Sequence, residues 1–153
     1  MGRIRISAEG AVGAPPEQTY RYLADMREHH PKFLSPAFSE FVVESGGVGA
    51  GTVVRFKVTA GGRSRDYRME VSEPEPGRVI RESDSNSSLV TTFTVTAEGS
   101  GSRVEIVTEW EGAGGIGGVF ERKFAPKVMR GIYADELARL DAYARGQAAF
   151  AAE

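Results

Sequence analysis

Few side chains in this sequence could act as a general base or bind a metal. His29 and His30 are the only histidines, so any imidazole base or ligand must come from this pair. Neighbouring residues on a helix point about 100° apart, and Asp25 and Glu28 do not complete a recognised metal-ligand spacing. The sequence contains no cysteine, which excludes thiolate nucleophiles and zinc–thiolate sites. We therefore expect no metal and no cofactor, and we place the two histidines at the mouth of a pocket.

The other catalytic patterns are also missing. No serine lies in a G-x-S-x-G elbow, and Glu70 and Glu105 alternate outward with apolar neighbours. The residues predicted to face the inside of the fold include tyrosines and threonines but no Asp, Glu, Lys or His. Tyr67 or Tyr133 could donate a proton, but an enzyme would still lack its base unless a histidine reached inward. This absence favours binding over catalysis.

Two glycine clusters resemble phosphate-binding motifs. Residues 112–117 fit G-x-G-x-x-G between a strand and a helix, but no second parallel strand follows, so a hinge is the preferred interpretation. The free amides at that helix start could still hold a carboxylate or phosphate. Residues 46–51 have P-loop glycine spacing without the following lysine, which indicates a turn.

Seven segments alternate apolar and polar residues, the period of strands that bury one face. The turns between them are mostly short and rich in glycine, which predicts an antiparallel meander. Pro15 and Pro16 favour a helix start after the first strand, and a second short helical turn runs to His30, where Pro31 ends it. The strands are expected near residues 3–9, 38–44, 52–59, 66–71, 79–82, 89–96 and 103–110.

The chain ends in one long helical pattern at residues 119–145, where apolar residues recur at steps of three and four. That helix would be about 40 Å long, whereas a strand of seven or eight residues covers about 25 Å. It must cross a curved sheet from corner to corner, and a hollow between the two is our functional hypothesis. Pro126 lies inside the pattern, so we expect a bend or a break there, with residues 112–125 either a lid or part of a fixed kink.

A group of aromatic, sulfur-containing and polar residues falls on the surfaces that would meet across this hollow. Any one residue of this kind usually belongs to an ordinary core. An inner face on which so many side chains end in a polar group is instead typical of a pocket, whose hydroxyl groups orient a ligand. The candidate ligand-binding residues are Val54, Phe56, Tyr67, Met69, Thr91, Phe93, Thr108, Trp110, Phe120, Phe124, Met129 and Tyr133, with His29 and His30 at the pocket mouth.

The order strand, two short helices, six strands and long C-terminal helix resembles the helix-grip fold of the START-like (SRPBCC) superfamily. That superfamily includes the birch-pollen allergen family and the polyketide cyclase/dehydrase and lipid-transport family. The local resemblance lies in residues 14–17 and 23–25 around the first helix, Pro31 and Pro36 before the second strand, and residues 73–78 and 91–95 in the middle strands. It implies an α+β fold in which a seven-stranded curved antiparallel sheet wraps around the C-terminal helix. It also implies a deep apolar cavity, which members use to carry lipids, hormones or polyketides and a minority use for cyclisation or dehydration.

The length, net charge and apolar content of the chain limit the kinds of partner it is expected to bind. The 153 residues fit a single helix-grip ligand-binding domain over residues 1–153, and a net charge of −2 argues against nucleic acid. No segment has the length of a membrane span or the apolar core of a signal peptide, so we expect a cytoplasmic protein without membrane insertion. The sequence predicts a carrier, sensor or sequestering protein for a hydrophobic, partly aromatic or lipid-like small molecule. The alternative is a metal-free cyclase or dehydratase acting in the same cavity, and the oligomeric state is left open.

Overall fold

The computed structural model describes residues 2–112 and 115–152, with side chains described for residues 2–112 and 126–149. Seven strands form one antiparallel sheet in the order β1-β7-β6-β5-β4-β3-β2. Strands β2 to β7 follow the chain as a meander, and β1 pairs with β7. The predicted α+β helix-grip architecture is confirmed. The strands are β1 (Arg3–Val12), β2 (Phe38–Ser45), β3 (Val53–Ala60), β4 (Arg63–Glu75), β5 (Val79–Asp84), β6 (Val90–Glu98) and β7 (Gly101–Glu111).

The alternation of residues along the strands decides which face of the sheet is covered. In β7, Val104, Ile106 and Trp110 are buried while Glu105 and Glu109, which alternate with them, are partly exposed. The hairpin between β3 and β4 turns through Gly61 and Gly62, both with positive φ, as a two-residue turn on right-twisted strands requires. The predicted strand phases are therefore confirmed where burial alternates most strongly.

Two short helical segments follow β1, as predicted. They are α1 (Pro16–Ala24) and the 3₁₀ helix η1 (His30–Phe33). The expected end of the second segment is wrong, because His30 begins η1 and Pro31 sits in its first turn, where a missing amide hydrogen costs nothing. The Thr19 hydroxyl lies 2.8 Å from the Ser102 hydroxyl, which ties α1 to the start of β7.

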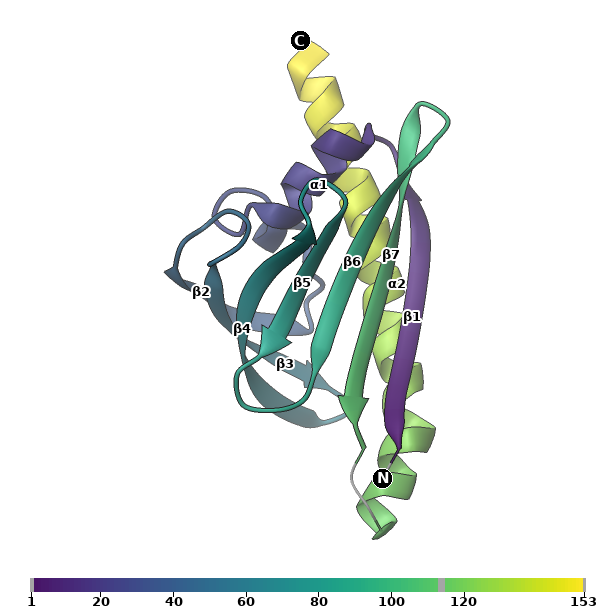
Figure 1. Cartoon of the computed structure of the whole chain (residues 1–153). Helices are drawn as coiled ribbons and strands as arrows, with labels where there is room; N and C mark the ends of the chain where they lie inside the picture. The colour runs from purple at the N-terminus through teal and green to yellow at the C-terminus, as the bar shows by residue number, and fades with distance from the viewer. Residues whose placement is uncertain (1, 113–114, 153) are drawn as a thin grey trace.

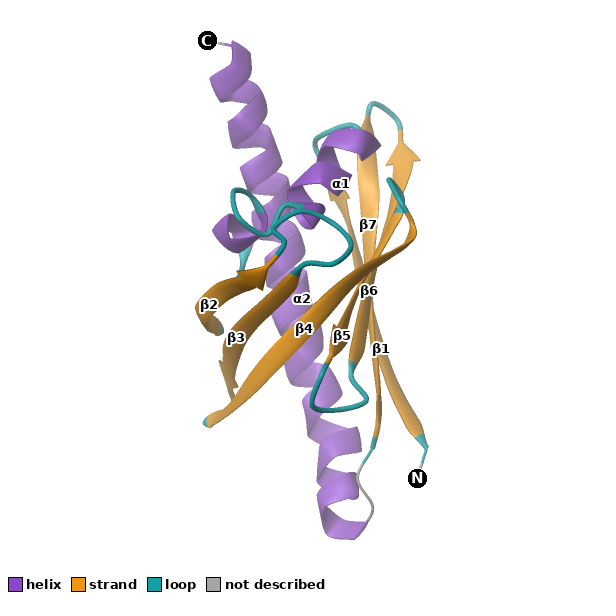
Figure 2. Ribbon diagram, turned by 60° about the vertical axis from the view of Figure 1, so that its left-hand side comes forward, coloured by secondary structure: helices purple, strands orange, loops and turns teal. Residues whose placement is uncertain are grey.

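Helix α2 (Gly115–Ala152) runs diagonally across the concave face of the sheet, and strands β2 to β4 curl around it (Figures 1 and 2). A Cβ placed on Gly10 would be 3.5 Å from the Leu137 Cβ, so the helix packs closely on β1. The Gly13 amide also donates to the Asp141 carboxylate at 2.8 Å. Within residues 2–112 and 115–152, no helix combines the length and apolar character of a membrane-spanning segment.

The expected break at Pro126 is not found. The helix continues through this residue from Gly115 to Ala152, longer at both ends than the predicted 119–145. Packing against the sheet along one face outweighs the local penalty of one proline, as tertiary contacts often do. The lid hypothesis for residues 112–125 concerns side chains that lie largely outside the described residues.

Candidate ligand cavity

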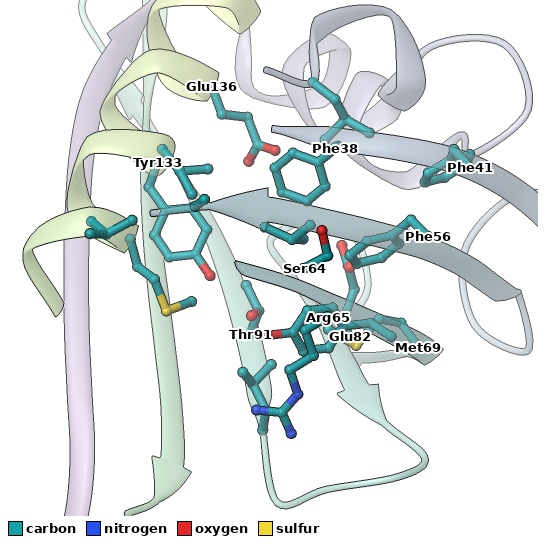
Figure 3. Close-up of a pocket in the computed structure, with 18 of the residues that line it drawn as sticks. Phe38, Phe41, Phe56, Ser64, Arg65, Met69, Glu82, Thr91, Tyr133 and Glu136 are labelled. Carbon is teal, nitrogen blue, oxygen red and sulfur yellow. The ribbon is translucent and has the colours of Figure 1, made fainter. Parts of the chain in front are cut away.

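A cavity of about 750 Å³ lies between the curled part of the sheet and α2 (Figure 3). Its walls come from η1, from strands β2 to β7 and from residues 128–136 of α2. This volume is within the range of pockets that take drug-sized organic molecules. Most of the wall is aromatic or aliphatic, and its aromatic members are Phe38, Phe41, Phe56, Tyr67, Phe93, Trp110 and Tyr133.

The aromatic rings on β2, β3 and β4 form a continuous wall. Phe56 lies at its centre, with ring centroids 5.4 Å from Phe38, 6.0 Å from Phe41 and 5.6 Å from Tyr67. The Phe41 and Phe56 rings are nearly parallel, and the other two pairs are tilted. Aromatic pairs at these separations stabilise each other beyond simple burial, so the wall is preformed.

A hydroxyl network crosses the opposite side of the cavity. The Thr108 hydroxyl lies 2.8 Å from that of Thr91 and 2.6 Å from the Tyr133 phenol. Burial raises the pKa of the Tyr133 phenol, which keeps it protonated at neutral pH. Thr91 and Tyr133 line the cavity, whereas Thr108 lies behind them and satisfies their hydrogen bonds.

Two carboxyl groups also line the cavity, Glu82 from β5 and Glu136 from α2. Burial raises the pKa of Glu82 to about 7. Burial, followed by the negative charges of Glu82 and Asp135, raises the pKa of Glu136 to about 8. The prediction that the inward-facing residues include no acid is therefore wrong, and it omitted two groups that titrate near neutral pH.

The two histidines have different surroundings. His30 lines the cavity and is 3% exposed, and its Nδ1–H donates to the Leu23 carbonyl at 2.7 Å. Burial lowers the pKa of His30 to about 4, so its ring is neutral at physiological pH. His29 is not part of the described cavity wall; its ring packs between Tyr22 and Tyr143, with Nδ1 2.6 Å from the Tyr143 hydroxyl.

The cavity opens beside the β3–β4 hairpin. Gly61, Arg63, Ser64 and Arg65 line it and are exposed, as is Val128 of α2, whose exposed fraction is 40%. The Arg65 guanidinium carbon lies 5.3 Å from the centroid of the Tyr67 ring. Residues that both line a cavity and meet solvent mark its entrance, so this entrance carries positive charge.

The predicted ligand-binding residues divide into three groups by location. Val54 and Thr108 are buried but are not part of the described cavity wall, and the side chains of Phe120 and Phe124 lie outside the described residues. The residues that the structure brings together around the cavity are Phe56, Tyr67, Met69, Thr91, Phe93, Trp110, Met129, Tyr133 and His30.

Sequence reasoning missed Glu82, Glu136, Phe38 and Phe41. A signal existed for both acids: Glu82 is two residues from the buried Ile80, and Glu136 lies three residues after Tyr133 on the helical face. Phe38 and Phe41 are three apart in a strand, where side chains alternate. The register of β2 shifts between Ser39 and Val42, and Glu40 has a positive φ of 54°, so both rings reach the cavity. No sequence pattern indicates such a bulge.

No metal site emerges from this arrangement. Among the described side chains, no group of three or more histidine, aspartate or glutamate residues is placed to hold a metal ion. Glu82, Glu136 and His30 contribute only two carboxyls and a ring whose Nδ1 is occupied.

Residues 3–145 match the family described as polyketide cyclase / dehydrase and lipid transport. The chain belongs to that family. The match covers every strand and most of α2, so family membership concerns the whole arrangement around the cavity.

Solved structures with the same fold extend this comparison. The KanY protein, determined by NMR, is 36% identical, with a TM-score of 0.84 over 95% of this chain and 99% of its own. The Zhui aromatase/cyclase from a Streptomyces species is 16% identical, with a TM-score of 0.75 over 94% of each chain. Major latex-like protein 151 from Panax ginseng is 13% identical, with a TM-score of 0.70 over 92% of this chain and 97% of its own. The last two show the fold alone. No curated protein matches this sequence.

Proposed function

We propose that this protein binds a hydrophobic small molecule, aromatic or lipid-like in character, in the cavity between the sheet and α2. The observation that carries the proposal is the cavity itself, about 750 Å³ in volume and walled by seven aromatic side chains among its lining residues. A cavity of this size lined by rings and few polar groups suits a ligand that buries most of its surface. The lipid-transport description of the family supports the same function.

Saturable binding of an apolar fluorescent dye tests this proposal. Trp110 lines the cavity and is the only tryptophan, so a bound dye should quench its emission. Phe56→Trp would narrow the cavity, while Val107→Trp, on the opposite face of the sheet, is the matched control. We expect weaker dye binding in the first variant alone. Native mass spectrometry of the purified protein would reveal a ligand that co-purifies. Failure of every apolar probe to bind would contradict the proposal.

A cyclase- or dehydratase-type enzyme is the second candidate, and the cavity-facing carboxyls of Glu82 and Glu136 favour it. Groups that titrate near neutral pH inside a pocket are suited to general acid–base work. The Zhui structure, a relative in fold only, is titled an aromatase/cyclase. If an activity is found, its loss in Glu82→Gln and Glu136→Gln with ligand binding retained would assign the protein to the enzymes.

A further inference from the structure

Glu82 and Glu136 are exposed by only 7% and 3%, and both contribute to the cavity wall. They come from opposite sides, one from the sheet and the other from α2 (Figure 3). Within the described part of the chain, neither carboxyl group has a hydrogen-bond or ion-pair partner. No fully enclosed side-chain nitrogen or oxygen among the described residues lacks a hydrogen-bond partner, so the two carboxyl groups expose oxygen atoms to the cavity, where a bound molecule can supply their partners.

The charges around the pair are one-sided. The two neighbouring charges that act on Glu136 are those of Glu82 and Asp135, both negative. The titratable groups that face the pair from other elements are the neutral His30 on η1 and the phenols of Tyr67 and Tyr133. Arg63 and Arg65 line the exposed entrance of the cavity instead. The interior is therefore acidic, and the entrance is basic.

We propose that the ligand is a hydrophobic molecule carrying a basic amine, whose ammonium group lies between the carboxylates of Glu82 and Glu136. This inference rests on the proposed binding function and names the chemical class of the ligand. A protonated primary amine has three N–H donors, more than a single carboxylate needs, so it has donors for both acids. Its positive charge favours the ionised forms of the two carboxyl groups, and this attraction is stronger in a medium of low dielectric than in water.

Other polar ends fit the pair less well. A carboxylate or phosphate would add negative charge to a site that already holds two acids. A hydroxyl can donate one hydrogen bond but cannot offset the charge of either carboxylate. The rings of Phe38, Phe56 and Trp110, which also line the cavity, suit the apolar body of the ligand and add cation–π attraction for an ammonium group.

Binding of an ammonium group changes the protonation of Glu82 and Glu136. In the empty cavity, burial and mutual repulsion favour the protonated carboxyls. A bound ammonium favours their ionised forms, so the pair releases protons to the buffer as the ligand enters. Affinity for an amine must then increase with pH as long as the amine itself stays protonated.

Three probes that share one ring system separate the possibilities. Calorimetric titration would compare 1-naphthylmethylamine, 1-naphthylmethanol and 1-naphthoic acid at pH 7.5. In the wild-type protein we expect the amine to bind at least tenfold more tightly than the alcohol, and the acid more weakly than either. Between pH 6 and pH 8, affinity for the amine should increase while affinity for the alcohol stays level.

Glutamine variants connect this preference to the pair. Glu82→Gln and Glu136→Gln should each lower the preference for the amine at least threefold, and the double variant should abolish it. Glu70→Gln changes an exposed carboxylate of β4, so the preference should be unchanged. Binding of the alcohol and circular dichroism check that each variant is folded. If a variant does not fold, the affinities of the wild-type protein for the three probes and their pH dependence still test the amine proposal.

The outcomes separate this inference from the proposed function. Equal affinities for amine and alcohol in the wild type, or a preference that survives the double substitution, would overturn the amine proposal and leave hydrophobic binding intact. Failure of the alcohol and the amine alike to bind would refute the binding function itself.

Discussion

Helix α2 lies over two regions of different construction. Toward its C-terminal end, Leu137, Leu140 and Ala144 are buried where α2 packs on β1 and η1. Met129, Tyr133 and Glu136, which lie between one and eight residues before Leu137, face the cavity. The packed region needs nothing further, because its side chains are apolar and touch one another. The hollow region instead places two buried acids, Glu82 and Glu136, against the cavity.

The largest expected difference between the regions concerns truncation of side chains on α2. Leu140 is 1% exposed, so Leu140→Ala should lower the free energy of unfolding by about 2–5 kcal/mol. Met129→Ala removes a side chain that already borders empty space and should cost about 1 kcal/mol. Urea denaturation would measure both. Equal losses would mean that the hollow contributes as much packing as the core.

The acid pair predicts that stability decreases as pH increases. The pKa values of Glu82 and Glu136 are raised in the folded state, so folding retains protons that the unfolded chain has released above about pH 5. Their stabilising contribution is complete below the unfolded pKa and disappears through pH 7 to 8. Between pH 6.5 and pH 8, the free energy of unfolding should fall by about 2 kcal/mol.

The range of pH 6.5 to 8 is chosen because His30 changes the free energy of unfolding with pH in the opposite direction. Its pKa is lowered in the folded state, so its contribution is present above about pH 6.5 and is lost as pH falls toward 4. Above pH 6.5 the acids act without this opposition. In thermal melts between pH 6.5 and pH 8, the melting temperature of the Glu82→Gln/Glu136→Gln double variant should change less with pH than that of the wild type. An unchanged slope in the double variant would assign the pH effect to other groups.

Glycine-to-alanine substitutions should change stability in opposite directions in the two regions. A Cβ on Gly101 would lie 2.7 Å from the Val12 carbonyl oxygen, a backbone atom, so Gly101→Ala should destabilise the packed region by about 1–2 kcal/mol. Gly131 of α2 has open space around the corresponding position, and Gly131→Ala should stabilise the helix by up to about 1 kcal/mol. Melting temperatures would report both. Destabilisation by the second change would show that residue 131 is tightly surrounded.

The packed region could be predicted from the sequence, and the hollow region only in part. Alternation along β7 and the helical repeat through Leu137 and Leu140 follow from burying apolar surface, and both patterns are local. The phase of β6 likewise placed Thr91 and Phe93 correctly on the inner face. Glu82 and Glu136 obey the same periodicities, but an acid on an apolar phase contradicts the usual cost of burial and was overlooked.

Other features depend on tertiary structure and leave no local signal. Phe38 and Phe41 share the cavity because of an irregular register in β2, and α2 continues through Pro126 although a proline inside a helical pattern predicts a break. The separation of His29 from His30 has the same origin, since Tyr143, which holds His29, lies more than a hundred residues away in sequence. Spacing along the chain could not reveal these contacts.

Because the wall of the cavity and the anchoring core use different residues of one helix, substitutions can address them separately. Changes at residues 129, 132, 133 and 136 alter the shape and charge of the hollow, whereas the anchoring of α2 depends on residues 137, 140 and 144. The residues that shape the hollow could therefore change by a few substitutions while the residues that anchor α2 stay the same. For protein engineering, these four positions define a compact library in which specificity can be varied on a scaffold that stays intact.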